Sequence, residues 1–252
     1  MLFVIFISDL KPVGLDNSLT KYADDTSLLV PERIDVDKMS EEFSRIMKWS
    51  SDNKLIVNLA KTKEIVFHRP NPKNCLSPKE LEEVERVEVT KLLGVWLQSD
   101  MGTASHIEYI THICNQRLYL LNQIRKQGLH QMQLLNVFQA IIWSRILYAS
   151  LAWYGYASDV HIDSIQKVLR KAKRWHIVNS DFTAVDLLRD NDLGLFHAVK
   201  ASNHCLNHLF APKTEHIHSM VLRPRGHKFA LPPLKSEFAR KSYVNRSLFM
   251  YI

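Results

Sequence analysis

The chain has 252 residues, and a composition of 46% hydrophobic and 10% aromatic residues excludes disorder throughout its length. Its three cysteines, Cys75, Cys114 and Cys205, are odd in number and far apart, which excludes a disulfide framework and favours a reducing cytoplasmic or nuclear compartment. The formal net charge of +7 favours an anionic partner or a basic surface in contact with solvent.

Two adjacent aspartates, Asp24 and Asp25, stand in an apolar, strand-like stretch at residues 21–30. The apolar segments 2–10 and 26–31 on either side predict a tight hairpin whose turn contains both acids. An ionised carboxylate in a poorly solvated setting must be paired or must ligate a cation, and two carboxylates at one hairpin tip suit a pair of Mg²⁺ ions. Asp-Asp is also a common turn dipeptide, so a purely structural turn is the alternative.

The next part of the chain predicts a helix packed under a small sheet. Residues 37–53 place apolar side chains at mostly helical spacing, with charged side chains on the other face. Residues 55–58 and 64–67 predict two strands around a turn that carries Lys61.

Residues 91–97, with the sequence K-L-L-G-V-W-L, are apolar around Gly94. A glycine at the centre of such a run predicts a bulged strand or hairpin in which the backbone comes close to another group. From Ser105 the pattern changes to a long helix that ends at Gly128.

Residues 131–153 predict a second helix that is apolar almost all round. Because Asn136, Gln139 and Arg145 interrupt it, we interpret it as a buried helix rather than a membrane span, and we expect no membrane partner.

A third predicted helix, over residues 160–177, carries an apolar stripe opposite a basic one. Residues 161–252 as a whole hold 15 basic and 7 acidic side chains, a net +8, whereas residues 1–160 hold 18 and 19, a net −1. Such a helix favours binding to a nucleic-acid backbone, and a merely solvated basic face is the alternative. The basic residues in question are Lys167, Arg170, Lys171, Lys173 and Arg174.

The remaining residues predict one or two further helices, over 185–189 and 195–210, followed by a basic stretch rich in proline. His204, Cys205 and His208 are close together in the sequence, but one cysteine without a C-x-x-C pair does not favour a zinc site.

Three motifs occur in an order that resembles the reverse transcriptases of non-LTR retrotransposons, the jockey-like and LINE-like mobile elements. They are Y-A-D-D with its apolar flanks, W-S-S-D-N-K-L-I-V-N-L-A-K-T-K-E-I-V-F, and K-L-L-G-V-W-L. The opening L-F-V-I-F-I-S-D-L is similar to the segment that follows the Q-G-S-x-L-G-P motif of that family.

The resemblance implies roles for six residues. Asp24 and Asp25 match catalytic ligands of Mg²⁺ or Mn²⁺, and Lys61 matches a lysine beside the incoming nucleotide, where it neutralises or protonates the leaving pyrophosphate. The hairpin of residues 91–97 matches the primer grip, which orients the primer 3′ end by backbone and apolar contact. The matching primer-grip residues are Leu93, Gly94 and Val95.

The implied fold is of the α+β class: a partial polymerase palm, made of a small antiparallel sheet with a helix, followed by a mainly α-helical thumb and a helical tail. We expect the palm at residues 1–104, the thumb with its basic helix at 105–178 and the basic tail at 179–252. The implied partners are an RNA template and a DNA primer duplex, and the oligomeric state is left open.

Two-metal polymerases need a third carboxylate from a separate strand, which in this family precedes the Q-G-S-x-L-G-P segment. This chain offers no candidate, since the nearest acid, Asp9, matches a residue after that motif. We therefore expect a polymerase fragment that is inactive alone. The alternatives are a nonenzymatic nucleic-acid-binding module and a fragment with no function of its own.

Overall fold

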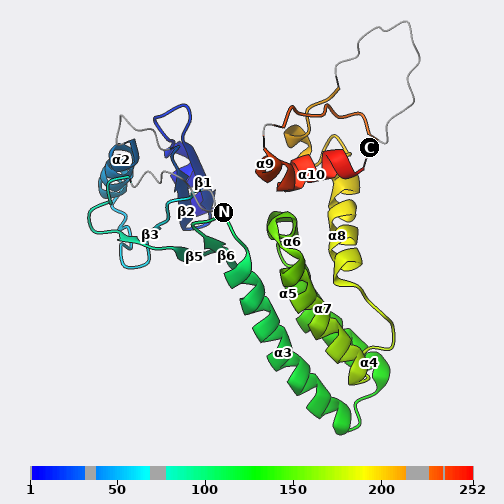
Figure 1. Cartoon of the computed structure of the whole chain (residues 1–252). Helices are drawn as coiled ribbons and strands as arrows, with labels where there is room; N and C mark the ends of the chain where they lie inside the picture. Colours follow the sequence, from blue (N-terminus) through cyan, green and yellow to red (C-terminus); the bar gives the residue numbers. More distant parts are fainter. Residues whose placement is uncertain (1, 32–37, 69–77, 214–226, 235, 252) are drawn as a thin grey trace, which may run out of the picture. The chain divides into compact units, whose positions relative to one another are not determined.

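The computed structural model of the chain describes residues 2–31, 38–68, 78–213, 227–234 and 236–251. Helices and small sheets occur together, in agreement with the predicted α+β class. The chain forms two compact units (Figure 1): an N-terminal unit of residues 1–90 and 98–101, and a C-terminal unit of residues 91–97 and 102–252.

Among its described residues, the N-terminal unit combines three helices with two small sheets. The predicted hairpin is present, because β1 pairs with β2 in an antiparallel register that places Tyr22 opposite Asp25. The parallel pair β3–β4 forms the second sheet. The elements are α1 (Leu2–Phe6), η1 (Ile7–Asp9), β1 (Ser18–Tyr22), β2 (Asp25–Leu29), α2 (Lys38–Asp52), β3 (Lys63–Glu64) and β4 (Glu85–Arg86).

A buried carboxylate, that of Glu42 on α2, joins this helix to the loop before β1. Its Oε1 accepts hydrogen bonds from the backbone N–H of Val13 at 2.7 Å, the N–H of Gly14 at 2.8 Å and the side-chain amide of Asn17 at 2.7 Å. Burial acts to raise the pKa of Glu42, but these hydrogen bonds outweigh burial, and the pKa is lowered. The loop before β1 is therefore fixed to α2 by polar contacts.

Two expectations for the N-terminal unit are wrong. Residues 2–10 form α1 and η1 rather than a strand. Residues 55–58 form no strand, and the strand expected at 64–67 is reduced to β3. An ion pair joins β4 to β3: Arg86 donates from Nε at 2.8 Å and from Nη2 at 3.0 Å to the Glu64 carboxylate. The spacing of apolar residues in the sequence does not predict this contact.

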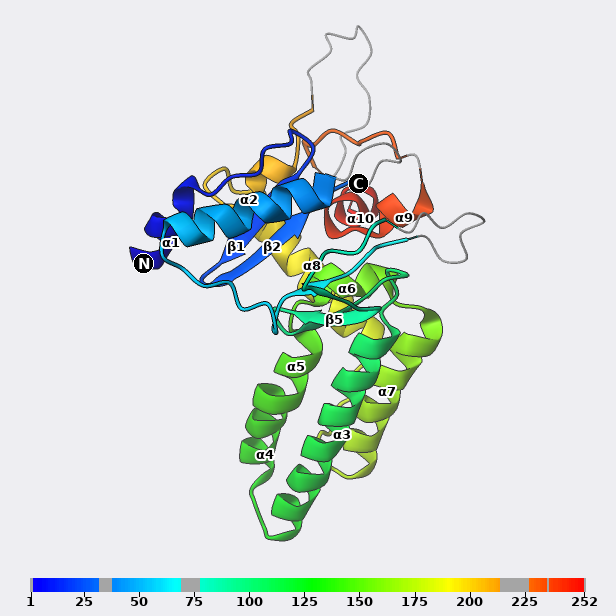
Figure 2. The ribbon, with the colours of Figure 1, turned by 90° about the vertical axis from the view of Figure 1, so that its left-hand side faces the viewer.

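The C-terminal unit is mainly helical and begins with the turn of a hairpin, β5–β6. Its helices follow in chain order, and Figures 1 and 2 show α3, α5 and α7 side by side. The elements are β5 (Val89–Leu92), β6 (Val95–Gln98), α3 (Ala104–Lys126), α4 (Gln131–Phe138), η2 (Gln139–Trp143), α5 (Ser144–Leu147), α6 (Ser150–Trp153), η3 (Tyr154–Tyr156), α7 (Asp159–Arg174), α8 (Ala184–Val199), η4 (Asn207–Leu209), α9 (Glu237–Lys241) and α10 (Tyr243–Met250).

A continuous apolar core joins α3, α4, η2, α5 and α7. Each helix buries side chains at every third or fourth position, as the sequence predicts for α3 and α7. Gly128, with a φ of +92°, follows the end of α3 in the left-handed conformation that glycine adopts without strain. The core side chains that are less than 2% exposed in these helices are Ile107, Ile110, Cys114, Leu118, Leu121, Leu134, Phe138, Ile142, Ile146, Ile165 and Ala172.

The predicted second helix is interrupted rather than continuous. It passes from α4 through the π-helical turn η2 to α5, and it breaks at Tyr148, where Ala149 has a φ of 50°. Among the described residues one stretch, Gln131–Tyr156, is long and apolar enough to cross a membrane. In its most apolar 18-residue segment, 28% is buried inside the protein. Phe138, Ile142 and Ile146 from this stretch pack into the core.

In the tail, the 16-residue helix α8 runs through Ala184–Val199, where one or two helices at 185–189 and 195–210 were expected. Helix α8 thus covers the expected break at 190–194 and ends before residue 210. A buried ion pair joins it to α10: Arg246 donates to the Asp192 carboxylate from Nε at 2.8 Å and from Nη2 at 3.0 Å. The residues of this tail belong to the same compact unit as α3 and α7. Cys114 is buried and Cys205 exposed, both as free thiols, and Cys75 lies outside the described residues.

Candidate nucleic-acid interface

Asp24 and Asp25 lie at the tip of the hairpin β1–β2. Asp24 is in the turn, after Ala23 with a φ of 53°, and Asp25 is the first residue of β2; both are exposed. Two carboxylates at one tip have the ligand chemistry that Mg²⁺ prefers, but no third His, Cys, Asp or Glu joins them within the part of the chain that the structure describes. The described residues therefore do not make up a two-ion site.

Lys61 lies in a tight turn that Asn58 organises. The backbone N–H of Lys61 donates to the Asn58 backbone oxygen at 3.1 Å and to its side-chain Oδ1 at 3.2 Å, and Thr62 Oγ1 donates to the same backbone oxygen at 2.9 Å. The turn leaves Lys61 exposed. Its side chain is free to meet a ligand, as any exposed turn lysine is.

The turn of the β5–β6 hairpin contains Leu93 and Gly94, with Val95 at the start of β6. The expected close approach of the backbone is confirmed: a Cβ on Gly94, whose φ is +86°, would lie 3.1 Å from Cε1 of Tyr148. The Tyr148 hydroxyl also donates to the carbonyl oxygen of Leu93 at 2.7 Å. The break in the helix at Tyr148 thus places a side chain that holds this turn.

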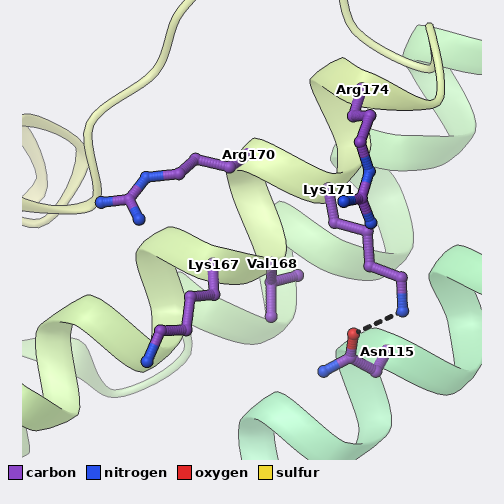
Figure 3. A pocket seen from close by; sticks show the side chains of 6 residues that line it. All are labelled: Asn115, Lys167, Val168, Arg170, Lys171 and Arg174. Carbon is purple, nitrogen blue, oxygen red and sulfur yellow. Dashed lines mark hydrogen bonds between the residues drawn. The ribbon is translucent and has the colours of Figure 1, made fainter.

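A groove of about 390 Å³ runs along α7 and is lined mostly by cations (Figure 3). Lys171 donates to Oδ1 of Asn115 on α3 at 3.1 Å and lies 4.6 Å from the centroid of the Trp175 ring. Four of the five predicted basic residues of α7 meet here. The lining residues are Asn115, Lys167, Val168, Arg170, Lys171 and Arg174.

The charge of the groove is only partly compensated. Asp163 pairs with Lys167 at 3.0 Å and with Arg170 at 3.2 Å, and these two cations lower the pKa of Asp163, chiefly through the hydrogen bond from Lys167. The four lining cations against this one carboxylate leave a net charge of +3 on this face of α7. The fifth predicted residue, Lys173, does not line the groove and pairs with Asp181.

Comparison with known proteins does not place the chain in a family. The chain has no significant match among protein-family models, curated proteins or solved structures.

A second cluster of cations and aromatic rings was not predicted from the sequence. Lys91 Nζ lies 4.8 Å from the centroid of the Tyr109 ring on α3 and 5.9 Å from that of Trp96 on β6. The Arg145 guanidinium carbon, on α5, lies 5.0 Å from the Tyr109 centroid and 6.0 Å from that of Tyr148. Cations held over aromatic faces are attracted by the ring quadrupoles.

One sequence signal for this cluster exists. Between Glu108 and Asp159 the chain contains no aspartate or glutamate, so 50 consecutive residues carry no negative side chain. The helices in this stretch are identified from the spacing of apolar residues, and that spacing gives no information about the absence of aspartate and glutamate. A count of charges over this stretch alone, rather than over residues 1–160, would have marked it as positive.

The electrostatic effect of the cluster reaches a buried histidine. Burial lowers the pKa of His106 to about 4, and the charges of Arg145 and Lys91 act in the same direction. His106 is therefore neutral at pH 7, and its Nδ1 accepts a hydrogen bond from the backbone N–H of Trp96 at 3.3 Å. The pKa of Tyr109 is lowered by the hydrogen bond from Lys91 and by the charge of Arg145.

Proposed function

We propose that the chain is the palm and thumb portion of an RNA-directed DNA polymerase of a non-LTR retroelement. In this proposal the chain itself binds the nucleic-acid backbone through α7. Mg²⁺ or Mn²⁺ is the cofactor of the intact polymerase. The order of the three sequence motifs supports the lineage. The observation that carries the binding is the cationic groove along α7.

The groove suits a row of phosphates rather than a single small anion. Its cations lie at positions 167, 170, 171 and 174, which span about 10 Å along the axis at 1.5 Å per residue. Val168 and Asn115 line the groove without adding charge. Backbone contacts of this kind neutralise phosphates without reading bases, so we expect binding without sequence preference.

The test is duplex binding as a function of salt. Contacts to three or four phosphates give a slope near −0.9 per phosphate, so affinity falls about forty- to 150-fold between about 50 and 200 mM salt. Reversal of the four lining cations to glutamate, at Lys167, Arg170, Lys171 and Arg174, removes this dependence.

A matched control carries four charge reversals on exposed lysines of the N-terminal unit, Lys11, Lys48, Lys54 and Lys79. It changes the net charge by the same amount and leaves the groove intact, so it retains most of the salt dependence. If the α7 variant and the control both bind duplex with the parent's affinity and salt dependence, the role of α7 is refuted.

The same proposal states that the chain alone does not extend a primer on an RNA template with Mg²⁺ or Mn²⁺. The carboxylate pair Asp24–Asp25 supplies two ligands, whereas a two-ion site needs a further bridging carboxylate. Extension that disappears in Asp24→Asn would show that the chain is a complete catalyst. The alternative, a nonenzymatic nucleic-acid-binding module, predicts the same salt dependence and the same absence of extension.

A further inference from the structure

We propose that Lys91, Tyr109 and Arg145 form a second site for a phosphodiester group, and that its ligand is a single strand of nucleic acid. The three residues, called the cation–tyrosine site below, come from β5, α3 and α5. The inference rests on the proposed function only for the class of ligand, because it uses none of the α7 cations. Lys91 and Leu93 do belong to the motif at residues 91–97, but Tyr109 and Arg145 lie outside all three motifs.

Both cations lie against one ring. Lys91 Nζ and the Arg145 guanidinium carbon are at most about 9.8 Å apart, the sum of their distances of 4.8 Å and 5.0 Å from the Tyr109 centroid. The Tyr109 hydroxyl lies 3.4 Å from Lys91 Nζ and provides a third polar group at the same place. Two successive phosphodiesters can contact both cations at any separation up to this limit.

The charge of the site is not compensated. No acidic side chain within the described ranges forms an ion pair with Lys91 or Arg145. Tyr109 and Arg145 also belong to the 50 residues without an acid. Two cations without a carboxylate, held close together on an aromatic ring, attract an anionic group from solution.

Arg145 is held in place before any ligand arrives. Its guanidinium group lies over the Tyr109 and Tyr148 rings, and its Nε is buried without a hydrogen-bond acceptor among the described residues. Ring contacts therefore restrict the guanidinium group, which lowers the entropy cost of binding a ligand.

The surface beside the cations is apolar and exposed, which favours a nucleic acid with unpaired bases. Leu92, Leu93 and Tyr148 around the hairpin turn are 36%, 42% and 47% exposed. Bases in a duplex are stacked inside it, whereas those of a single strand are free to cover apolar and aromatic side chains. A phosphate site next to such a surface therefore fits a single strand better than a duplex.

The experiment measures binding of the full chain to a fluorescent single-stranded oligonucleotide of mixed sequence, about 12 nucleotides long. Lys91→Gln combined with Arg145→Gln is expected to weaken binding about tenfold at low salt, because charge-assisted hydrogen bonds to phosphate are lost. The slope of log K against log salt falls by about 0.7 to 1.4, for one or two phosphates. The matched control, Arg125→Gln with Lys126→Gln, makes the same change in net charge on α3 away from the site, and it changes affinity less than about twofold.

Tyr109→Phe removes only a hydroxyl, so it tests the same site if the double variant does not fold. It is expected to weaken binding about threefold. Parent-like binding of the oligonucleotide by Tyr109→Phe and by the folded double variant overturns the proposal. If these variants lose binding to vesicles containing phosphatidylserine while oligonucleotide binding is unchanged, the proposal is also overturned, because the ligand is then a lipid headgroup.

The two proposals can fail separately. If the α7 variant binds duplex like the parent, the proposed function fails, and the single-strand measurements still decide the cation–tyrosine site.

Discussion

The two compact units are stabilised in different ways. Among the described residues, the N-terminal unit buries four apolar side chains, Ile7, Leu10, Leu81 and Val84, whereas the C-terminal unit buries 22. The N-terminal unit also buries the polar residues Glu42, Ser50, Glu64 and Ser99. Apolar packing dominates one unit, and directed polar contacts replace it in the other.

This difference separates the two groups of candidate site residues. The α7 cations, Tyr109 and Arg145 lie on helices that pack into a large apolar core. Asp24 and Asp25 lie on a hairpin without a buried side chain. A binding surface needs side chains that are held in place, and the C-terminal unit provides them.

Phe138→Ala is expected to lower the free energy of unfolding by about 3–5 kcal/mol, because Phe138 is fully buried in the helical core. Leu29→Ala, on the hairpin β1–β2 and 58% exposed, is expected to cost within about 0.5 kcal/mol. Urea unfolding followed by circular dichroism measures both. Equal costs would mean that the two units do not differ in packing as described.

Acidification is expected to weaken the C-terminal unit through His106. Its pKa is lowered from 6.5 to about 4 in the folded chain, so the unfolded chain takes up the proton first, and stability is lost as pH falls from about 6.5 toward 4. The loss between pH 7 and pH 5 is about 2 kcal/mol. His106→Asn keeps an acceptor for the Trp96 N–H and removes this part of the pH dependence. Urea unfolding at pH 7 and pH 5 measures the free energy of unfolding of variant and parent. The same pH dependence in both would exclude His106 as its source.

Glu42→Gln is expected to destabilise the N-terminal unit by about 1–2 kcal/mol at pH 7, because three hydrogen bonds lose a charged acceptor. The pKa of Glu42 is lowered, so its stabilisation is complete above the ordinary glutamate pKa of 4.5 and is lost as pH falls below it. Hydrogen exchange of the Val13 and Gly14 amides reports the change. Glu41→Gln, on the exposed neighbour, serves as control and leaves these amides protected; equal effects of both variants would contradict the account.

Tyr148→Phe is expected to cost about 1 kcal/mol, the contribution of one hydrogen bond, and to loosen the hairpin turn locally. Hydrogen exchange over residues 92–95 measures the loosening. Tyr119→Phe removes a hydroxyl from a ring that is 56% exposed and should leave exchange unchanged. Unaltered exchange in Tyr148→Phe would show that Gly94 and the chain's own turn geometry are sufficient.

Prediction from the sequence succeeded where the structure depends on local periodicity. The spacing of Ile107, Ile110 and Cys114 identifies α3, and the alternation of apolar and basic residues identifies α7. The α7 groove was accessible from the sequence because its cations share one helix face. Gly94 was likewise recognised as a point of close approach, although its neighbour Tyr148 was not.

Prediction failed where residues far apart in the sequence determine the structure. Glu42 accepts hydrogen bonds from residues 25 to 29 positions away, and no repeat in the sequence marks that contact. Residues 55–58 have a strand-like composition but no strand partner among the described residues, so composition alone misplaced them. Lys91 and Arg145 meet over Tyr109 only because the hairpin and the broken helix bring them together.

The most direct test of the account compares duplex binding, as a function of salt, between two variants of the full chain. In Asp24→Asn with Asp25→Asn, the slope of log K against log salt is predicted to stay at the parent value of about −3, because exposed hairpin acids contact no phosphate. In the variant with the four α7 lining cations reversed to glutamate, the slope is predicted to approach zero. A slope that stays at the parent value in the α7 variant, with a fold intact by circular dichroism, would contradict the claim that the C-terminal unit binds the nucleic-acid backbone through α7.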